Sequence, residues 1–214
     1  MFIELVDSLR CPRPHEDAWL VLGADRMGGR NVMDGVLGCP VCDARFPIAN
    51  GIADLRTGAP GPAPDAAPSP VAPDAEQAMR LAAFLNLGDA RGYAVLAGQW
   101  TAQAAGVQAI TDMHLLLVNP APGVVIGDGT SGILADDRLP VAAGSAYGAA
   151  LDRAASAALL AHAVLGVRPG GRMVAPVDLP LPEGVTALAR DAALWVAERA
   201  AAPGPLVSLS RGGR

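Results

Sequence analysis

The stretch YAVLAGQWTAQAAG, residues 93–106, decides how most of this chain is interpreted. Its first half is a short apolar run that ends at Gly98, and its second half is rich in Ala and Gln, so the pattern predicts a strand followed by a helix. In many α/β proteins a glycine-rich junction of this kind holds a nucleotide-like cofactor. Here Gln99 and Trp100 stand where further glycines would let a ligand approach the backbone. The junction is therefore either a working cofactor site or a filled one.

Strand and helix patterns alternate on both sides of this junction. A helix is expected over 74–87 with Asp74 as its N-cap, and a continuous apolar strand over 114–120. Further strands are expected at 123–128 or 132–137, at 146–152, 170–177 and 204–211, and further helices at 101–110, 154–167 and 185–200. Strands that alternate with helices imply right-handed crossovers. We therefore expect an α/β fold with a Rossmann-like, mainly parallel sheet and helices on both faces.

The composition narrows the classes of protein to consider. The chain has 214 residues, a formal net charge of -5 and a pI near 5.1, and no basic stripe stands out, so nucleic acid is not a favoured partner. All 16 basic residues are arginine, which excludes lysine chemistry such as a Schiff base. The start, MFIELVDSLR, lacks the basic region of a signal peptide, and no apolar run has the ~20 residues of a transmembrane segment. These features favour an intracellular, cytoplasmic protein.

A change of composition divides the chain into three parts. Residues 57–74 are dense in Pro, Ala and Gly and have no apolar periodicity, which is typical of an extended linker. It separates a head, 1–56, from a body, 75–214. In the head we expect a short leading helix at 2–9, strands at 19–24 and 35–39, and a strand–turn–strand over 44–55.

All three cysteines lie in the head and have the spacing of metal ligands. Cys11 and His15 form a C-x3-H pair, and Cys39 and Cys42 form a C-x2-C pair. Three thiolates and one imidazole would complete the tetrahedral shell of a structural zinc ion and leave no open position for water. A head this small also needs a metal to supplement its core. Two alternatives remain open at this point: the cysteines are reduced bystanders, or the fourth ligand is a carboxylate such as Asp17 or Asp43.

The segments LVDSLRCP, GVLGCPVC and DARFPIANGIADL make the head resemble the Trm112-type zinc ribbon. The shared pattern is a leading helix, R-C-P, C-P-x-C, and a Phe-Pro-Ile followed by an N-G-I turn, and it covers nearly all of 1–56. The resemblance implies a protein-interaction module, because the best-known members of that family bind and activate methyltransferases. The family usually has C-P-x-C at the first knuckle, whereas this chain has C-P-R-P-H, so His15 as a ligand is inferred.

The body resembles class I S-adenosylmethionine (SAM)-dependent methyltransferases over 92–211. VLGVRPGGRMVAPV, 164–177, is similar to the segment that precedes the fifth strand of that family. The stretch 133–154 is similar to the part of the family where an acidic residue, here Asp136 or Asp137, meets the adenine and where a Phe-Asp pair opens the fourth strand.

The departures from that family lie where the cofactor would sit. Gly98 is the one glycine left in the first loop, and Trp100 adds bulk there. Asn119 stands where the resemblance expects an acidic residue that accepts from both ribose hydroxyls, and an amide has one acceptor oxygen. The Phe-Asp pair becomes AYGAALD, with small residues at the matching site. We therefore expect Gly98, Trp100, Asn119 and Asp136 to mark a vestigial pocket in which SAM does not bind normally.

Three functions compete on these observations. We favour a non-catalytic, zinc-binding, methyltransferase-like accessory subunit that docks onto a protein partner or a multi-subunit complex, with no catalytic residue of its own. The alternative is an active SAM-dependent methyltransferase with a divergent pocket, and a third possibility is a small-molecule binder that has changed its ligand. His114 and His162 are expected to be structural, and any tryptophan left exposed is expected to anchor a protein contact.

Overall fold

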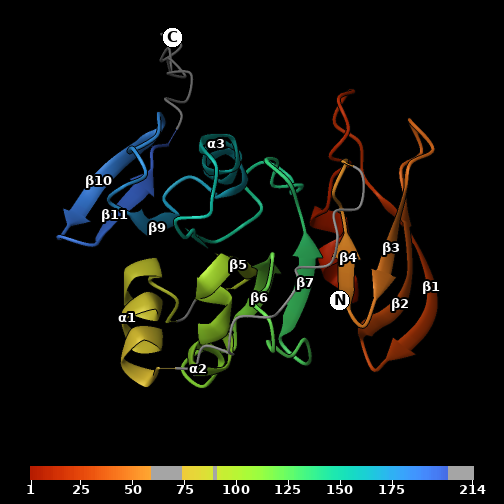
Figure 1. Cartoon of the computed structure of the whole chain (residues 1–214), viewed down its shortest axis with the longest axis horizontal. Helices are drawn as coiled ribbons and strands as arrows, with labels where there is room; N and C mark the ends of the chain where they lie inside the picture. Colours follow the sequence, from red (N-terminus) through yellow and green to blue (C-terminus); the bar gives the residue numbers. More distant parts are fainter. Residues whose placement is uncertain (59–73, 89–90, 202–214) are drawn as a thin grey trace, which may run out of the picture.

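The computed structural model describes residues 1–58, 74–88 and 91–201 (Figure 1). The described chain is an α/β protein in which eleven strands form one sheet, in the order β1-β2-β3-β4-β7-β6-β5-β8-β9-β11-β10. The strands are β1 (Val21–Gly28), β2 (Asn31–Gly38), β3 (Arg45–Ala49), β4 (Ile52–Asp54), β5 (Tyr93–Ala97), β6 (His114–Val118), β7 (Thr130–Leu134), β8 (Ala149–Ala150), β9 (Arg172–Pro176), β10 (Val185–Arg190) and β11 (Leu194–Arg199). The helices are η1 (Ile3–Ser8), α1 (Ala75–Leu85), η2 (Gly98–Gln103), α2 (Ala104–Gln108) and α3 (Ala157–Gly166).

The middle of the sheet is parallel and doubly wound. Strands β4, β7, β6, β5, β8 and β9 lie side by side, and each neighbouring pair is parallel. From β5 the chain moves outward through β6 to β7 and then returns to the other side of β5 for β8 and β9. The order therefore reverses between β5 and β8, which is the switch point at which doubly wound proteins bind ligands. The predicted Rossmann-like, mainly parallel sheet is confirmed.

Helices cover both faces of the parallel strands, as expected, although they are few. The apolar run of β6 is buried on both faces, with Leu115 and Leu117 facing the core under α1 and α2, and Leu116 and Val118 facing the core shared with α3. The helix α1 begins where the sequence predicts, because the carboxylate of Asp74 accepts hydrogen bonds from the N–H groups of the first turn.

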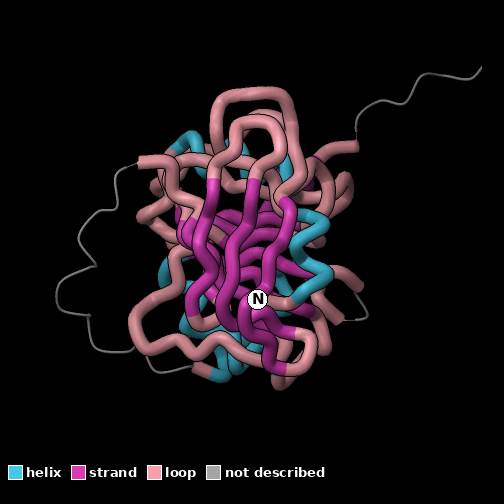
Figure 2. Tube along the Cα trace, turned by 90° about the vertical axis from the view of Figure 1, so that its right-hand side faces the viewer, coloured by secondary structure: helices cyan, strands magenta, loops and turns pink. Residues whose placement is uncertain are grey.

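The head joins this sheet directly. Its strands β1 to β4 form an antiparallel meander, and β4 then pairs in parallel with β7 of the body. Figure 2, viewed from the head, shows its strands in front of the body strands and steeply rotated against them, as expected of a strongly twisted sheet. Leu5, Leu9 and Phe46 of the head share one buried cluster with Val118 and Ile133 of the body. Head and body therefore have a common sheet and a common core.

The chain from 185 to 200 differs from the prediction. Its Ala-rich pattern predicts a helix, but the structure has a hairpin of β10 and β11, and β11 pairs antiparallel with β9. Asp191 explains the turn, because its carboxylate oxygen accepts from the N–H groups of both Ala193 and Leu194 at 2.7 Å. The strand expected at 204–211 and most of the 57–74 linker lie outside the described residues.

The two edge strands of the sheet share an irregularity. The edge strands are β1 and β10, and each pairs with a single neighbour in the described chain. The register of β1 against β2 shifts between Ala24, Arg26 and Met27, and the register of β10 against β11 shifts between Ala187 and Ala189. These shifts are the mark of β-bulges.

No helix among the described residues combines the length and the apolar character needed to span a bilayer.

Candidate functional site

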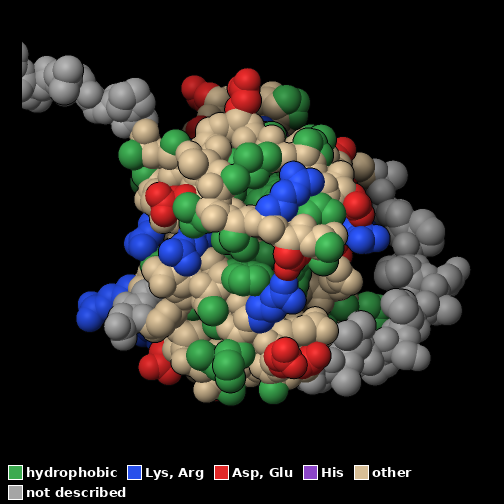
Figure 3. All heavy atoms as spheres, turned by 90° about the vertical axis from the view of Figure 1, so that its left-hand side faces the viewer, with side chains coloured by type: hydrophobic (Ala, Val, Ile, Leu, Met, Phe, Trp, Pro, Cys, Tyr) green, Lys and Arg blue, Asp and Glu red, His purple; other side chains and the backbone are tan. Residues whose placement is uncertain are grey.

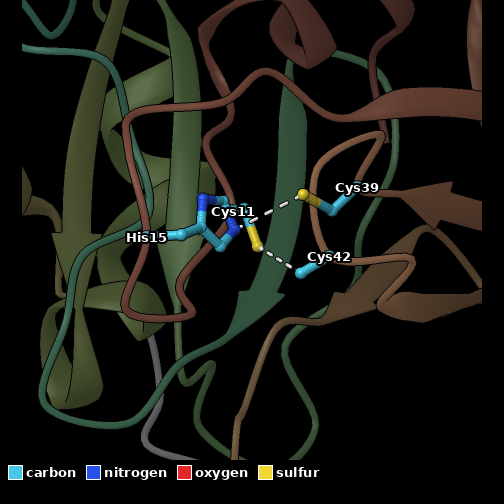
Figure 4. A group of neighbouring side chains, drawn as sticks. All are labelled: Cys11, His15, Cys39 and Cys42. Carbon is cyan, nitrogen blue, oxygen red and sulfur yellow. Dashed lines mark hydrogen bonds between the residues drawn. The ribbon is translucent and has the colours of Figure 1, made fainter.

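The four predicted metal ligands meet in one cluster (Figure 4). Cys11 and His15 lie on the loop after η1, and Cys39 and Cys42 lie on the turn between β2 and β3. The four ligand atoms all lie within 4.8 Å of one another. Cys11 and Cys39 are buried, and the other two side chains are half-buried. This Cys/His cluster could hold a metal ion.

The spacing of the ligand atoms fits a tetrahedral ion. Zinc bonds of about 2.3 Å to sulfur and about 2.0–2.1 Å to nitrogen separate two sulfurs by about 3.8 Å, and a sulfur from a nitrogen by about 3.5 Å. The Sγ atoms of Cys11 and Cys42 are 3.8 Å apart, and Cys39 Sγ lies 3.5 Å from His15 Nε2. The donor set and the spacing therefore both suit zinc.

The surroundings of the cluster affect its ligands differently: they favour the metal-binding form of His15 and Cys39 and oppose ionisation of Cys11. His15 Nδ1 lies 2.6 Å from the carbonyl oxygen of Glu16, so its N–H donates there and leaves Nε2 to bind a metal. Burial raises the pKa of the Cys11 thiol to about 12. Burial also opposes ionisation of Cys39, but the N–H groups of Cys42 and Val41 donate to its sulfur and lower its pKa to about 7.

The two carboxylates that could have replaced His15 stay out of the cluster. Asp17 is 3.2 Å from the guanidinium of Arg10, and Asp43 is not among the clustered ligands. Arg10 is itself 9% exposed, and its backbone N–H donates to Pro140 O of the body at 2.9 Å. The loop that carries Cys11 and His15 is therefore attached to the body at Arg10, next to Cys11.

A second candidate site lies at the carboxyl ends of the central strands. Gly98 follows β5, Asn119 follows β6, Asp136 lies just beyond β7, and Asp152 lies just beyond β8. In a doubly wound sheet these positions surround the crevice where a ligand binds. The side chains of all three polar residues instead bind groups of this chain.

Asp152 occupies the space beside Gly98. Gly98 has a positive φ of 58°, and any Cβ placed on it would collide with the Asp152 carboxylate. Asp152 is 9% exposed, and its oxygens accept from Gln99 N at 2.8 Å and from Ala154 N at 3.0 Å. The bare backbone of Gly98 is thus covered by a side chain of the same protein.

Trp100 bridges the switch point. Its Nε1–H donates to Leu151 O at 2.9 Å, which ties η2 after β5 to the segment after β8. The rest of the indole is half-buried and packs against the core under α1. Trp100 therefore connects the segments that follow β5 and β8.

Asn119 and Asp136 are exposed but are also engaged. Asn119 has a φ of 50° and makes a reciprocal pair with the backbone of Ala135, in which its Nδ2 donates to Ala135 O and its Oδ1 accepts from Ala135 N, both at 3.0 Å. Asp136 Oδ2 accepts from the backbone N–H of Thr57 at 2.8 Å and of Gly58 at 3.3 Å. The side chains of Asn119 and Asp136 are therefore both bonded to backbone groups of this chain.

Asp152 is the residue of this site that the sequence reasoning missed. The available signal was its place at the end of the small apolar run AYGAALD, because a polar residue at the carboxyl end of a parallel strand points to the ligand-binding edge. His114 behaves as expected of a structural histidine: its Nε2 is 2.8 Å from Ser131 Oγ, its ring stacks on Phe2, and burial lowers its pKa to about 4.

Two cavities adjoin this edge of the sheet. One, of about 420 Å³, lies at Asp136 and is lined also by Pro12, Leu55 and Thr57. The other, of about 270 Å³, lies between α1 and the ends of β5 and β9, beside Trp100.

Comparisons with known proteins give a likeness of fold. No family model and no curated protein matches the sequence, so the Trm112-type resemblance rests on the residues quoted above. Among solved structures, the MycE methyltransferase of the mycinamycin biosynthetic pathway, in complex with Mg, SAH and mycinamycin VI, matches with a TM-score of 0.46 at 10% identity, over 60% of this chain and 49% of that chain. A MycE complex with Mg and SAH gives 0.46 at 11% identity, over 61% and 49%.

The antibiotic-resistance methyltransferase Kmr matches with a TM-score of 0.40 at 18% identity, over 58% of this chain and 93% of that chain. The chain spans about half the length of the MycE chains that it matches. Likenesses of this size carry no argument about chemistry, and the strand order carries the fold class.

Proposed function

We propose that this chain is a non-catalytic, zinc-binding, methyltransferase-like protein that docks onto a larger protein assembly and does not use SAM. The observation that carries the proposal is the Asp152 carboxylate against Gly98. A methyltransferase needs bare backbone there for the methionine part of its cofactor. In this chain the same space holds an anionic side chain that is bonded to the following amide.

The other contacts at this edge point the same way. The Asn119 amide is bonded through both of its polar ends to Ala135, so binding a ribose would first require breaking that pair. Trp100 is fixed by its bond to Leu151 O. Each engaged group would have to be released before a cofactor could bind, and each neutral hydrogen bond given up costs about 0.5–1.5 kcal/mol.

Zinc would have a structural role in this proposal. Three thiolates and an imidazole complete its coordination shell, so the ion would present no open position for catalysis. The ion would join the η1 loop to the turn between β2 and β3. That loop also carries Arg10, whose backbone is bonded to the body at Pro140, so the metal would also support the junction of head and body.

The docking role has its support on the outer surface of the head. Trp19 is 67% exposed and Val21 is 63% exposed. Val21 pairs with Gly38, so both lie at the same end of the sheet as the C-x2-C turn, where Val41 is also exposed. Exposed tryptophan with neighbouring apolar side chains is the composition of a protein-contact centre.

Calorimetric titration of the zinc-loaded protein with SAM tests the proposal. We expect no binding at millimolar concentrations, and a combined Trp100→Gly and Asn119→Asp change should raise the affinity if the pocket is vestigial. Circular dichroism of the variant confirms that it remains folded. Micromolar binding of SAM to the unaltered protein would refute the non-catalytic proposal.

An active SAM-dependent methyltransferase is the second candidate. The observation in its favour is the cavity of about 420 Å³ at Asp136, because the methyltransferase resemblance places the adenine beside Asp136 or Asp137. In that case SAM would bind in the titration, and the Asp136→Ala variant would have a lower affinity for SAM. The unaltered protein would also convert SAM to SAH when given its acceptor.

A further inference from the structure

The cavity beside Trp100 adjoins the vestigial pocket and shares Trp100 with it. It lies between α1 and the carboxyl ends of β5 and β9, and Leu194 at the start of the antiparallel β11 also lines it. Figure 3 shows this side of the molecule, where arginine and apolar side chains lie next to one another. A mixed wall at the ligand-binding edge of a doubly wound sheet is the usual setting of a small-molecule site.

The wall of this cavity carries arginine and aromatic side chains. Arg80 and Arg153 line it, and no Asp or Glu is among the residues that line it. The aromatic rings of Phe84 and Trp100 provide apolar surface, together with the buried side chain of Leu81. The volume of about 270 Å³ suits a molecule with one or two rings.

Arg80 is held in place but is not saturated. Its guanidinium pairs with Asp191 and lies 5.1 Å from the centre of the Phe84 ring. Asp191 in turn is fixed by the N–H groups of Ala193 and Leu194. Only one of the guanidinium nitrogens has a hydrogen-bond partner among the described residues, so the others can bind a second anion.

We propose that this cavity binds a small aromatic carboxylate. The guanidinium group of Arg80 presents parallel N–H donors that match a carboxylate, and the ring of the ligand would lie against Phe84 and Trp100. Arg153, on the segment after β8, lies at the same wall, where its Nε is 3.2 Å from the carboxylate of Asp178. Gly98, Asn119 and Asp136 do not line the cavity, whereas Trp100 of the vestigial pocket does.

Calorimetric titration with benzoate and with 1-naphthoate tests the proposal. We expect saturable binding of both carboxylates, with 1-naphthoate the tighter because it covers more of the apolar wall. Benzamide keeps the ring but lacks the charge, and inorganic phosphate keeps the charge but lacks the ring, so both should bind about tenfold more weakly or worse.

Three variants separate the cavity from general charge effects. Arg80→Gln should weaken the binding of 1-naphthoate about tenfold, whereas Asp191→Asn should tighten it, because the amide keeps the oxygen that accepts from Ala193 and Leu194 but gives up the charge that competes for Arg80. Arg26→Gln is the matched control, since Arg26 is a similarly exposed arginine paired with Asp34 in the head.

The titrations and the variants together decide whether the cavity binds aromatic carboxylates. Binding that follows the carboxylate, the ring and Arg80, and that is insensitive to Arg26, supports the site. The proposal is overturned if neither carboxylate binds at millimolar concentration, if phosphate or benzamide binds as well as 1-naphthoate, or if Arg26→Gln has the effect of Arg80→Gln. Far-ultraviolet circular dichroism and the melting temperature show that each variant is folded.

Discussion

Replacing Asp152 by alanine should destabilise the protein, because the carboxylate is buried and bonded at both oxygens. It accepts from Gln99 N at 2.8 Å and from Ala154 N at 3.0 Å and is 9% exposed. A hydrogen bond to a charged group contributes about 1.5–3 kcal/mol. Water can reach the Ala154 amide, which lies in a turn, so we expect a total loss of about 2–4 kcal/mol of the free energy of unfolding.

The assay is urea denaturation followed by circular dichroism, with thermal melting as a second measurement. For a chain of this size the loss corresponds to a fall of about 5–10 °C in melting temperature. Asp152→Asn is the control, because it keeps one acceptor oxygen and should lose roughly half as much. If Asp152→Ala unfolds within about 0.5 kcal/mol of the unaltered protein, the range typical of neutral surface changes, then Asp152 does not hold η2 in place and the filled-pocket reasoning fails.

Three further predictions follow from the head and its contacts. Protein purified without added metal should contain about one zinc per chain, and Cys39→Ser should abolish it; a folded protein with metal content near zero would exclude the zinc site. Head and body should unfold in one transition, because β4 pairs with β7 and both parts share one core, so chelation should lower the melting temperature of the whole chain; two separate transitions would contradict this. Stability should fall as pH drops from about 6.5 to about 4, because burial lowers the folded-state pKa of His114 to about 4 and the unfolded chain takes up the proton first; His114→Gln should remove that part of the pH dependence, and an unchanged profile would argue against it.

The features that the sequence predicts well are those with local signals. The apolar run of β6 and the Asp74 cap of α1 depend on residues close together in the chain. The Cys/His cluster joins residues far apart, but its spacing motifs identify both halves before the structure brings them together. Zinc geometry constrains such motifs strongly enough that no long-range information is needed.

The missed features depend on contacts between distant elements. Residues 185–200 have enough alanine to favour a helix, but the open edge of β9 offers strand pairing that outweighs this propensity. The pairing of β4 with β7 has no signal in either strand, because a parallel ladder is formed by backbone groups. The role of Asp152 could not be predicted from the sequence, because it depends on the fold that places its carboxylate against Gly98.

The bulges in the two edge strands affect whether another strand can pair with this sheet. An exposed edge strand with an even row of unpaired N–H and C=O groups is a template for a further strand. A sheet with two such edge strands could polymerise. In β1 and β10 the shifted register breaks the even row of N–H and C=O groups that an added strand needs. Self-association through the edge strands is therefore disfavoured.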